Sequence, residues 1–107
     1  GDGIRARQMD ALLAQLPQRP GVLGGDLNIW LGTREHAYRA AAARFPDAVA
    51  PDPPPTFRER LALDHLFFRL PAGWRARSDL AESRYGSDHV PVVGAIETAP
   101  ASIDPNR

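Results

Sequence analysis

The chain has 107 residues, the size of one domain, and its 43% hydrophobic and 24% charged residues are typical of a soluble globular protein. Thirteen Lys and Arg residues balance thirteen Asp and Glu residues, which excludes a strongly basic domain that holds nucleic acid by bulk charge. The absence of cysteine excludes disulfides and thiolate metal sites, and no apolar run approaches the roughly 20 residues of a membrane helix.

The chain begins with a pattern typical of a helix followed by a strand. A helix is predicted over residues 4–16, and Pro17 ends it. The apolar residues that fall mostly on one of its faces are Ile4, Met9, Leu12, Leu13 and Leu16. After a Pro-Gly turn, residues 22–28 predict a short buried strand. This order indicates α/β layering, with the helix packed on a sheet.

A second helix is predicted over about residues 34–44, where an alanine run has high helix propensity. Thr33 is a suitable N-cap for it, and Glu35 favours its first turn. The stretch 46–55 contains five prolines. It therefore predicts a stiff surface loop and no regular structure.

The second half of the chain predicts strands. A short strand at 56–57 is followed by the strongest strand, 61–70, and by a weaker one over 74–83. The last strand is predicted at 90–96. The polar segment 98–107 contains two prolines and is predicted to be a disordered tail.

The first polar cluster is Gly24-Gly25-Asp26-Leu27-Asn28, at the end of the first predicted strand. Asp26 and Asn28 would point to the same side of that strand. A carboxylate beside a carboxamide is typical of a metal-dependent hydrolytic site, in which Asp activates a water and Asn binds a substrate oxygen. Alternatively, the strand runs into an Asx-turn in which both side chains only satisfy backbone groups.

The second cluster, Leu63-Asp64-His65-Leu66-Phe67-Phe68, lies on a strand whose two faces both look buried. A carboxylate on an apolar face needs a partner. A histidine elsewhere in the chain would suit Asp64, because the carboxylate fixes its tautomer and stabilises its charged form. An ion pair with an arginine is the alternative. His65 points to the opposite face and is predicted to be a packed or edge histidine.

The third cluster, Ser87-Asp88-His89-Val90-Pro91, comes directly before the last predicted strand, at the rim of the sheet. Asp88 is a hard oxygen ligand suited to Mg²⁺, and His89 is able to donate a hydrogen bond to a phosphate. One alternative is a turn in which Ser87 or Asp88 caps local backbone. A serine hydrolase is a weaker alternative, because no Gly-x-Ser-x-Gly elbow is present.

Together and in this order, the motifs Gly-Asp-x-Asn, Leu-Asp-x-x-Phe and Ser-Asp-His-x-Pro-Val resemble the C-terminal half of the endonuclease/exonuclease/phosphatase superfamily. The resemblance covers most of residues 4–97, and Arg7-Gln8 is similar to part of the helix that precedes the family's Gly-Asp-x-Asn strand. It implies an α/β fold that is half of a two-sheet α/β sandwich. One mainly antiparallel or mixed sheet with helices on one face is expected over residues 1–97, followed by the tail.

The resemblance also implies a role for each motif residue. Asp26 would orient or deprotonate the attacking water, and Asn28 would contact the scissile phosphate. Asp88, together with Asp26, would hold the divalent metal, Mg²⁺ or alternatively Mn²⁺. His89 would bind the phosphoryl oxygen, and Asp64 would pair with His89.

The sequence departs from the family pattern at its start. The family's Asn, its metal-binding Glu and an Asn/His motif have no counterpart, because only three residues precede Ile4. The chain is therefore expected to be a partial domain, inactive alone, that is partnered by a missing N-terminal half. The expected function is metal-dependent hydrolysis of a phosphate ester by activated water; the alternative is a non-catalytic remnant or binding module. The substrate is left open between nucleic acid, nucleotide and phospholipid or inositol headgroup.

Overall fold

The structure, a computed structural model, describes residues 2–29, 31–47, 55–57 and 62–100. Its elements in chain order are α1 (Asp2–Gln15), β1 (Gly21–Asp26), the 3-10 helix η1 (Gly32–Arg34), α2 (His36–Arg44), β2 (Asp64–Arg69), β3 (Arg75–Leu80) and β4 (Val92–Glu97). Helices and strands are both present, so the predicted α/β class is confirmed.

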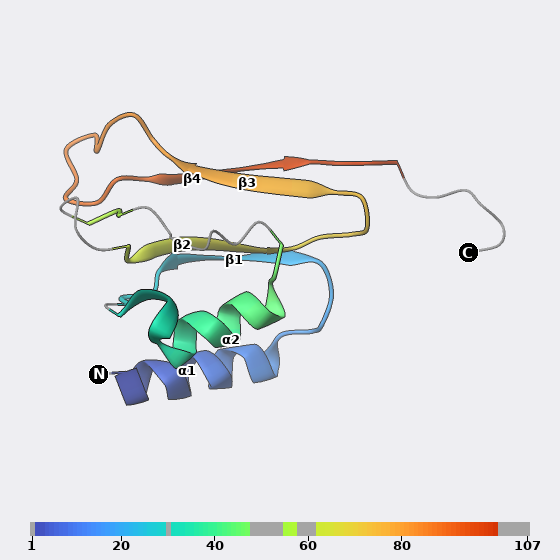
Figure 1. Cartoon of the computed structure of the whole chain (residues 1–107), viewed down its shortest axis with the longest axis horizontal. Helices are drawn as coiled ribbons and strands as arrows, with labels where there is room; N and C mark the ends of the chain where they lie inside the picture. Colours follow the sequence, from blue (N-terminus) through green and yellow to red (C-terminus); the bar gives the residue numbers. More distant parts are fainter. Residues whose placement is uncertain (1, 30, 48–54, 58–61, 101–107) are drawn as a thin grey trace, which may run out of the picture.

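The elements form three layers, which Figure 1 shows from bottom to top as the two helices, the β1–β2 pair and the β3–β4 pair. The strands are antiparallel, and the helices cover one face of the β1–β2 pair, as predicted. In the part of the chain that the structure describes, the strands are divided between two two-stranded sheets and do not join into the single sheet that was expected. Leu66 and Phe68 of β2 reach Gly94 of β4 with their side chains, so the two sheets meet face to face.

The hydrophobic core lies between the helices and the β1–β2 sheet. Phe67 of β2 is 1% exposed, and its ring meets the ring of Tyr38 edge-on at a centroid distance of 5.3 Å. The other buried core residues are Met9, Leu13, Ile29, Ala37, Ala41 and Phe45. The core therefore fixes the helix layer against β2, the strand that also carries Asp64.

The apolar face predicted for the first helix is confirmed only in part. Met9 and Leu13 are buried, whereas Ile4 and Leu12 are 52% and 42% exposed. The reason is that α1 packs mainly against α2 and not against the sheet, so only a narrow stripe of α1 is covered. Within the described ranges, neither helix is long and apolar enough to cross a membrane.

The second helix starts later than predicted, at His36. Thr33, the predicted N-cap, lies inside η1, and Glu35 takes the N-cap position without a side-chain capping bond. The Glu35 side chain is fully buried and accepts hydrogen bonds from Arg5 Nε at 2.7 Å and from the Leu31 N–H at 2.8 Å. Its carboxylate therefore joins α1 to the turn before α2 instead of capping the helix.

β1 is shorter and more exposed than the buried strand predicted over 22–28. It ends at Asp26, and Val22 is 51% exposed. Among the described residues β1 has one strand neighbour, β2, so its other edge is open. Val22 pairs with Phe68, the β2 residue whose ring packs against Gly94 of β4. Asn28 adopts a left-handed backbone conformation with a φ of 51°, which no regular strand accommodates.

The strands of the second half correspond to the predicted ones with shorter or shifted bounds. The exception is the strand predicted at 56–57, where Phe57 forms only an isolated bridge with His89. Within the Pro-rich loop, residues 48–54 lie outside the described part of the chain. Its first residues are attached to β2, because the Asp47 N–H donates to the carbonyl of a β2 residue at 2.9 Å.

The start of the predicted disordered tail is attached to the fold. The indole Nε1 of Trp74 donates to the carbonyl of Ala99 at 3.0 Å. This bond holds Ala99, two residues after the end of β4, beside the start of β3. The rest of that tail, residues 101–107, lies outside the described residues.

The close approach of the two sheets gives a stability prediction at Gly94. A Cβ atom there would lie 2.9 Å from both Leu66 Cδ1 and Phe68 Cζ, which is too close. We expect Gly94→Val to lower the free energy of unfolding by about 1–3 kcal/mol in urea denaturation, through overpacking. Ala95→Val, at an exposed position of the same strand, serves as the control and should change it by less than about 0.5 kcal/mol. Equal effects of the two variants would show that the sheets do not meet at Gly94.

Candidate functional site

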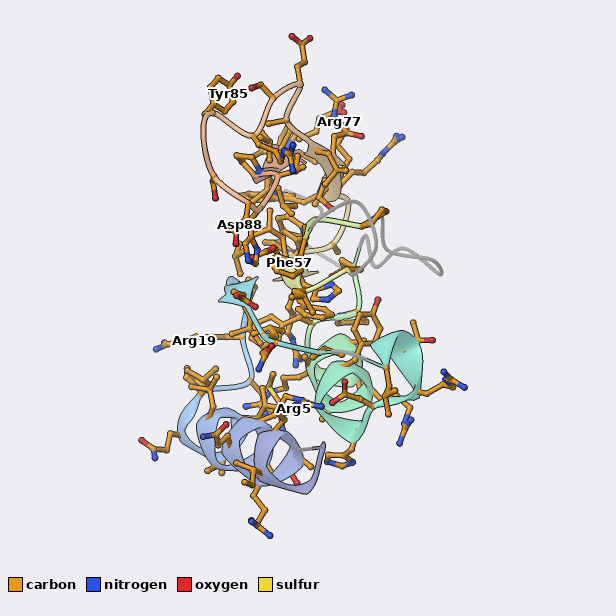
Figure 2. All side chains as sticks on the ribbon, turned by 90° about the vertical axis from the view of Figure 1, so that its left-hand side faces the viewer. Arg5, Arg19, Phe57, Arg77, Tyr85 and Asp88 are labelled. Carbon is orange, nitrogen blue, oxygen red and sulfur yellow. The ribbon has the colours of Figure 1, made fainter. Side chains whose placement is uncertain are left out.

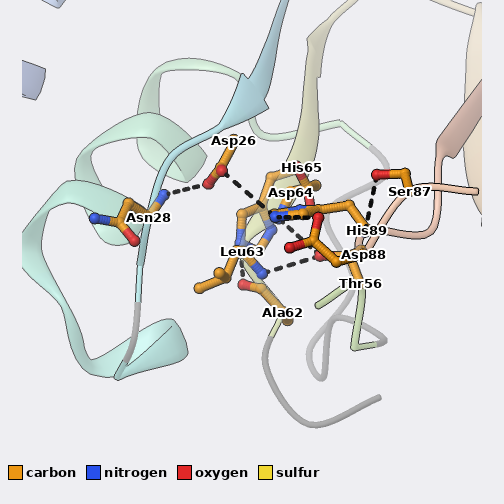
Figure 3. A network of polar contacts seen from close by, with 10 residues as sticks. All are labelled: Asp26, Asn28, Thr56, Ala62, Leu63, Asp64, His65, Ser87, Asp88 and His89. Atoms are coloured by element: carbon orange, nitrogen blue, oxygen red, sulfur yellow. Dashed lines mark hydrogen bonds and ion pairs between the residues drawn. The ribbon is translucent and has the colours of Figure 1, made fainter. Parts of the chain in front are cut away.

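Two aspartates face each other across the end of the β1–β2 sheet. Asp26 of β1 and Asp64 of β2 are register partners in the antiparallel ladder. Like charges directly opposite each other destabilise a strand pair. His89, from the loop before β4, reaches both carboxylates, as Figure 3 shows. One potential ligand atom from each of the three side chains lies within 4.8 Å of the others.

Asp64 and His89 make the closest contact in this group. His89 Nδ1 donates to Asp64 Oδ2 over 2.5 Å. Both side chains are mostly buried, with 20% of Asp64 and 26% of His89 exposed. The buried carboxylate therefore has a histidine as its partner, which was the preferred prediction, and the described residues provide no arginine beside it. The bond places a proton on Nδ1 and orients the other ring nitrogen.

The Nε2 atom of His89 faces two further carboxylates. Asp26 Oδ2 and Asp88 Oδ1 each lie 3.9 Å from it. Both aspartates are accessible, with 49% and 62% of their side chains exposed. The structure therefore brings together four of the five predicted site residues around one imidazole ring.

Asn28, the fifth, takes a different place from the one predicted. Its backbone N–H donates to Asp26 Oδ1 at 2.9 Å, which is an Asx-turn. The chain has left the strand at this point, so Asp26 and Asn28 do not share one side of it. Asn28 lies on the far side of Asp26 from His89 in Figure 3. The Asn28 N–H thus holds the Asp26 carboxylate through Oδ1. The other oxygen of that carboxylate, Oδ2, faces the His89 imidazole.

A tight loop before β4 presents Asp88 and His89. Tyr85 and Gly86 both have positive φ angles, 50° and 85°, so the chain reverses sharply there. The Ser87 hydroxyl accepts the backbone N–H of His89 at 3.1 Å, the local capping role that the sequence left open. In Figure 2 the Tyr85 side chain projects outward from the top layer, away from Asp88.

The surroundings of His89 favour its charged form. The hydrogen bond to Asp64 is the largest cause that raises the pKa of His89, and the charges of Asp64, Asp26 and Asp88 raise it further. Partial burial opposes them without reversing the direction. The imidazole is therefore suited to carry a proton above the pH at which a free histidine loses it.

This gives a pH prediction. We expect the His89 ring to titrate above 6.5, its ordinary pKa, in NMR spectra of the folded chain. Since the folded-state pKa exceeds the unfolded-state value, the stabilisation is complete below pH 6.5 and is lost as the pH rises through the folded-state pKa. Urea denaturation across that range measures the loss. Asp64→Asn should lower the titration midpoint, and a wild-type midpoint at or below 6.5 would contradict the contact.

His65 is a packed histidine, as predicted. It is 6% exposed, its Nε2 lies 2.7 Å from the carbonyl oxygen of Ala62, and its ring meets Tyr38 edge-on at 5.2 Å. Burial lowers the pKa of His65, opposite to the direction at His89. His65 is therefore packed in the interior, whereas His89 belongs to the candidate site.

Thr56 and Phe57 belong to the site, although the sequence predicted only a short strand there. The Phe57 ring lies 4.8 Å from the His89 ring, tilted by 50°, and so covers one side of the imidazole. Thr56 is fully buried between the segments that carry Asp64 and His89. In the sequence, Thr56 and Phe57 show only as a Thr-Phe pair shortly before a buried strand. Their contacts with Asp64 and His89 form only when the loops close, so the local sequence does not predict them.

The donor set around His89 suits a hard divalent cation in part. Asp64 Oδ2 and His89 Nδ1 are engaged with each other. Asp26, Asp64 and His89 are the side chains whose ligand atoms converge within 4.8 Å, and Asp88 adds a further exposed carboxylate beside the same ring. Carboxylate oxygens are the ligands that Mg²⁺ and Mn²⁺ prefer.

Comparison of the chain with protein-family models, with curated proteins and with solved structures gave no match. Neither a family nor an activity is thus established by likeness to another protein. The contacts establish an oriented histidine beside two accessible carboxylates.

Proposed function

We propose that the chain forms part of the active site of a metal-dependent phosphoesterase of the endonuclease/exonuclease/phosphatase type. One observation carries the proposal: Asp64 holds His89 through Nδ1 at 2.5 Å, while Nε2 of the same ring faces Asp26 and Asp88. A histidine fixed and charged in this way is a donor aimed at an anionic oxygen. The order of the three motifs in the sequence supports the same conclusion.

Each residue has a task in this proposal. His89 donates from Nε2 to a phosphoryl oxygen, and Asp64 keeps the ring oriented and protonated. Asp26 accepts a proton from the attacking water or orients it, and the Asn28 backbone N–H holds the Asp26 carboxylate in place. Asp26 and Asp88 would hold the divalent ion, which when bound neutralises charge on the phosphate.

The substrate class is a phosphate ester. Nucleic acid, nucleotide and phospholipid or inositol headgroups share this group, and the site residues recognise the phosphate and not what it is attached to. The net charge of zero gives no bulk attraction to a long polyanion. Specificity would therefore come from surfaces outside the four-residue site.

A non-catalytic binding module is the second candidate. The observation in its favour is the Asx-turn, because Asp26 already accepts the Asn28 N–H and thereby serves the local backbone. In that case the same residues would bind a phosphate or a cation without hydrolysis. Isothermal titration calorimetry with Mg²⁺, together with turnover assays, separates the two candidates.

The donor set leads to a prediction about residues 1–107 alone. Mg²⁺ demands near-octahedral oxygen coordination and gives up water reluctantly, so two aspartates hold it weakly. We expect the chain alone to hydrolyse bis-p-nitrophenyl phosphate no faster than background with Mg²⁺ or Mn²⁺. Supplying in trans an N-terminal half of this superfamily that carries the metal-binding Glu, which together with residues 1–107 is called the combined protein, should produce metal-dependent turnover.

The assay has a matched control, and two of its outcomes would contradict a prediction. Asp79→Asn, at an exposed position of β3, should leave the turnover of the combined protein unchanged, whereas Asp88→Asn should abolish its metal dependence. Metal-dependent turnover by the chain alone would contradict the donor count. A combined protein that binds Mg²⁺ but hydrolyses no phosphate ester would contradict the proposed function and favour the binding module.

A further inference from the structure

Thr56 is a buried polar residue that forms hydrogen bonds with the backbone on both sides of the Asp64–His89 pair. It is 0% exposed. Its Oγ1 accepts two backbone N–H groups, from Leu63 at 3.1 Å and from Asp64 at 3.0 Å. The hydroxyl therefore binds the backbone of Asp64, the first residue of β2, and of the residue before it.

The backbone of Thr56 binds the segment that carries His89. The carbonyl of Thr56 accepts the N–H of Val90 at 2.7 Å. The next residue, Phe57, forms a bridge with His89 and lays its ring against the imidazole. Side chain and main chain of one residue thus hold the two segments that carry the site pair.

The two segments need such a connection. Asp64 lies on β2 and His89 directly precedes β4, and these strands belong to different sheets, with no strand pairing between them in the described part of the chain. The contact between Asp64 and His89 is nevertheless 2.5 Å. A hydrogen bond of that length tolerates little relative movement of its two backbones.

We infer that Thr56 is a positioning residue, which sets the distance and orientation of His89 relative to Asp64 by binding the backbone on both sides of the pair. The catalytic consequence rests on the proposed function; the positioning itself does not. Loss of the hydroxyl acceptor would leave two buried N–H groups without their partner, so the start of β2 would shift to find another. The carboxylate would move with it.

Two substitutions isolate the hydroxyl. Thr56→Val keeps the shape and removes the acceptor, and Thr56→Ser keeps the acceptor and removes a methyl group. Thr33→Val, at an exposed threonine of η1, is the control for the substitution itself. The first readout is the far-downfield proton NMR signal of a short charge-assisted N–H···O bond, here His89 Nδ1–H, recorded on residues 1–107.

We expect the downfield signal in the wild type, in Thr56→Ser and in Thr33→Val, and its loss or upfield movement in Thr56→Val. An unchanged signal in folded Thr56→Val would overturn the inference. Should Thr56→Val not fold, Thr56→Cys replaces it, because sulfur is a weak acceptor of similar size. A full-strength signal in Thr56→Cys would overturn the inference equally.

The second readout is turnover of bis-p-nitrophenyl phosphate by the combined protein. We expect Thr56→Val to lower kcat roughly 10- to 100-fold with little change in KM, and Thr56→Ser to restore most of it, because misplacement of a catalytic group acts on the chemical step. A Thr56→Val protein with wild-type kcat would refute the catalytic consequence. A wild type without any turnover, but with the downfield signal, would defeat the proposed function and leave the positioning role standing.

Discussion

Replacing His89 by alanine is expected to reduce turnover of a phosphate ester by roughly 10²- to 10³-fold in the combined protein. The reason is the direction of its free ring nitrogen. Asp64 occupies Nδ1, so Nε2 is the donor available to a phosphoryl oxygen that lies near Asp26 and Asp88. Steady-state kinetics on bis-p-nitrophenyl phosphate and on a nucleotide ester would measure the loss.

His36→Ala is the matched control for this variant. His36 also pairs with an aspartate, Asp10, at 2.8 Å, but both lie exposed on the helix layer. Its removal should leave turnover unchanged. Circular dichroism should show that both variants keep the wild-type fold, since His89 sits at the rim of a sheet. Near wild-type turnover in His89→Ala would remove His89 from the proposed mechanism.

Asp64→Asn is expected to reduce turnover roughly 10- to 100-fold, because an amide neither charges the imidazole nor holds it as firmly. The decisive measurement is the double variant. Since Asp64 acts only through His89, adding Asp64→Asn to His89→Ala should cost little more than His89→Ala alone.

The double-mutant cycle distinguishes orientation from general support of the fold. Fully additive losses would show that Asp64 stabilises the end of β2 and has no special relation to His89. Asp79→Asn, at an exposed position of β3, again serves as the control. It should change turnover very little, and its effect should add to that of His89→Ala. Unfolding free energies of the four proteins should accompany the kinetics, so that a loss of folded protein is not counted as a loss of turnover.

The local patterns of the sequence predicted the elements well where one residue type dominates. Pro17 follows directly on the last turn of α1, and the alanine run forms a helix. The exposed positions of α1 and the shift of the α2 start were not predictable in this way. Both depend on which neighbours pack against the helix, and Glu35 shows this, because Arg5 draws its carboxylate away from the cap.

The candidate site divides in the same manner. The sequence by itself determined that Asp64 needs a charged or polar partner, because it stands among apolar residues of a strand, and that Asp88 and His89 lie at a strand start. The resemblance predicted His89 as that partner, and the tertiary structure shows the contact; only the tertiary structure placed Asp26 opposite Asp64 in the ladder. It also decided that Asn28 turns away into an Asx-turn and that Thr56 joins the two halves. The physical reason is that burial and local propensity are properties of neighbouring residues, whereas a hydrogen bond between residues 25 positions apart exists only after strand register and loop closure are set.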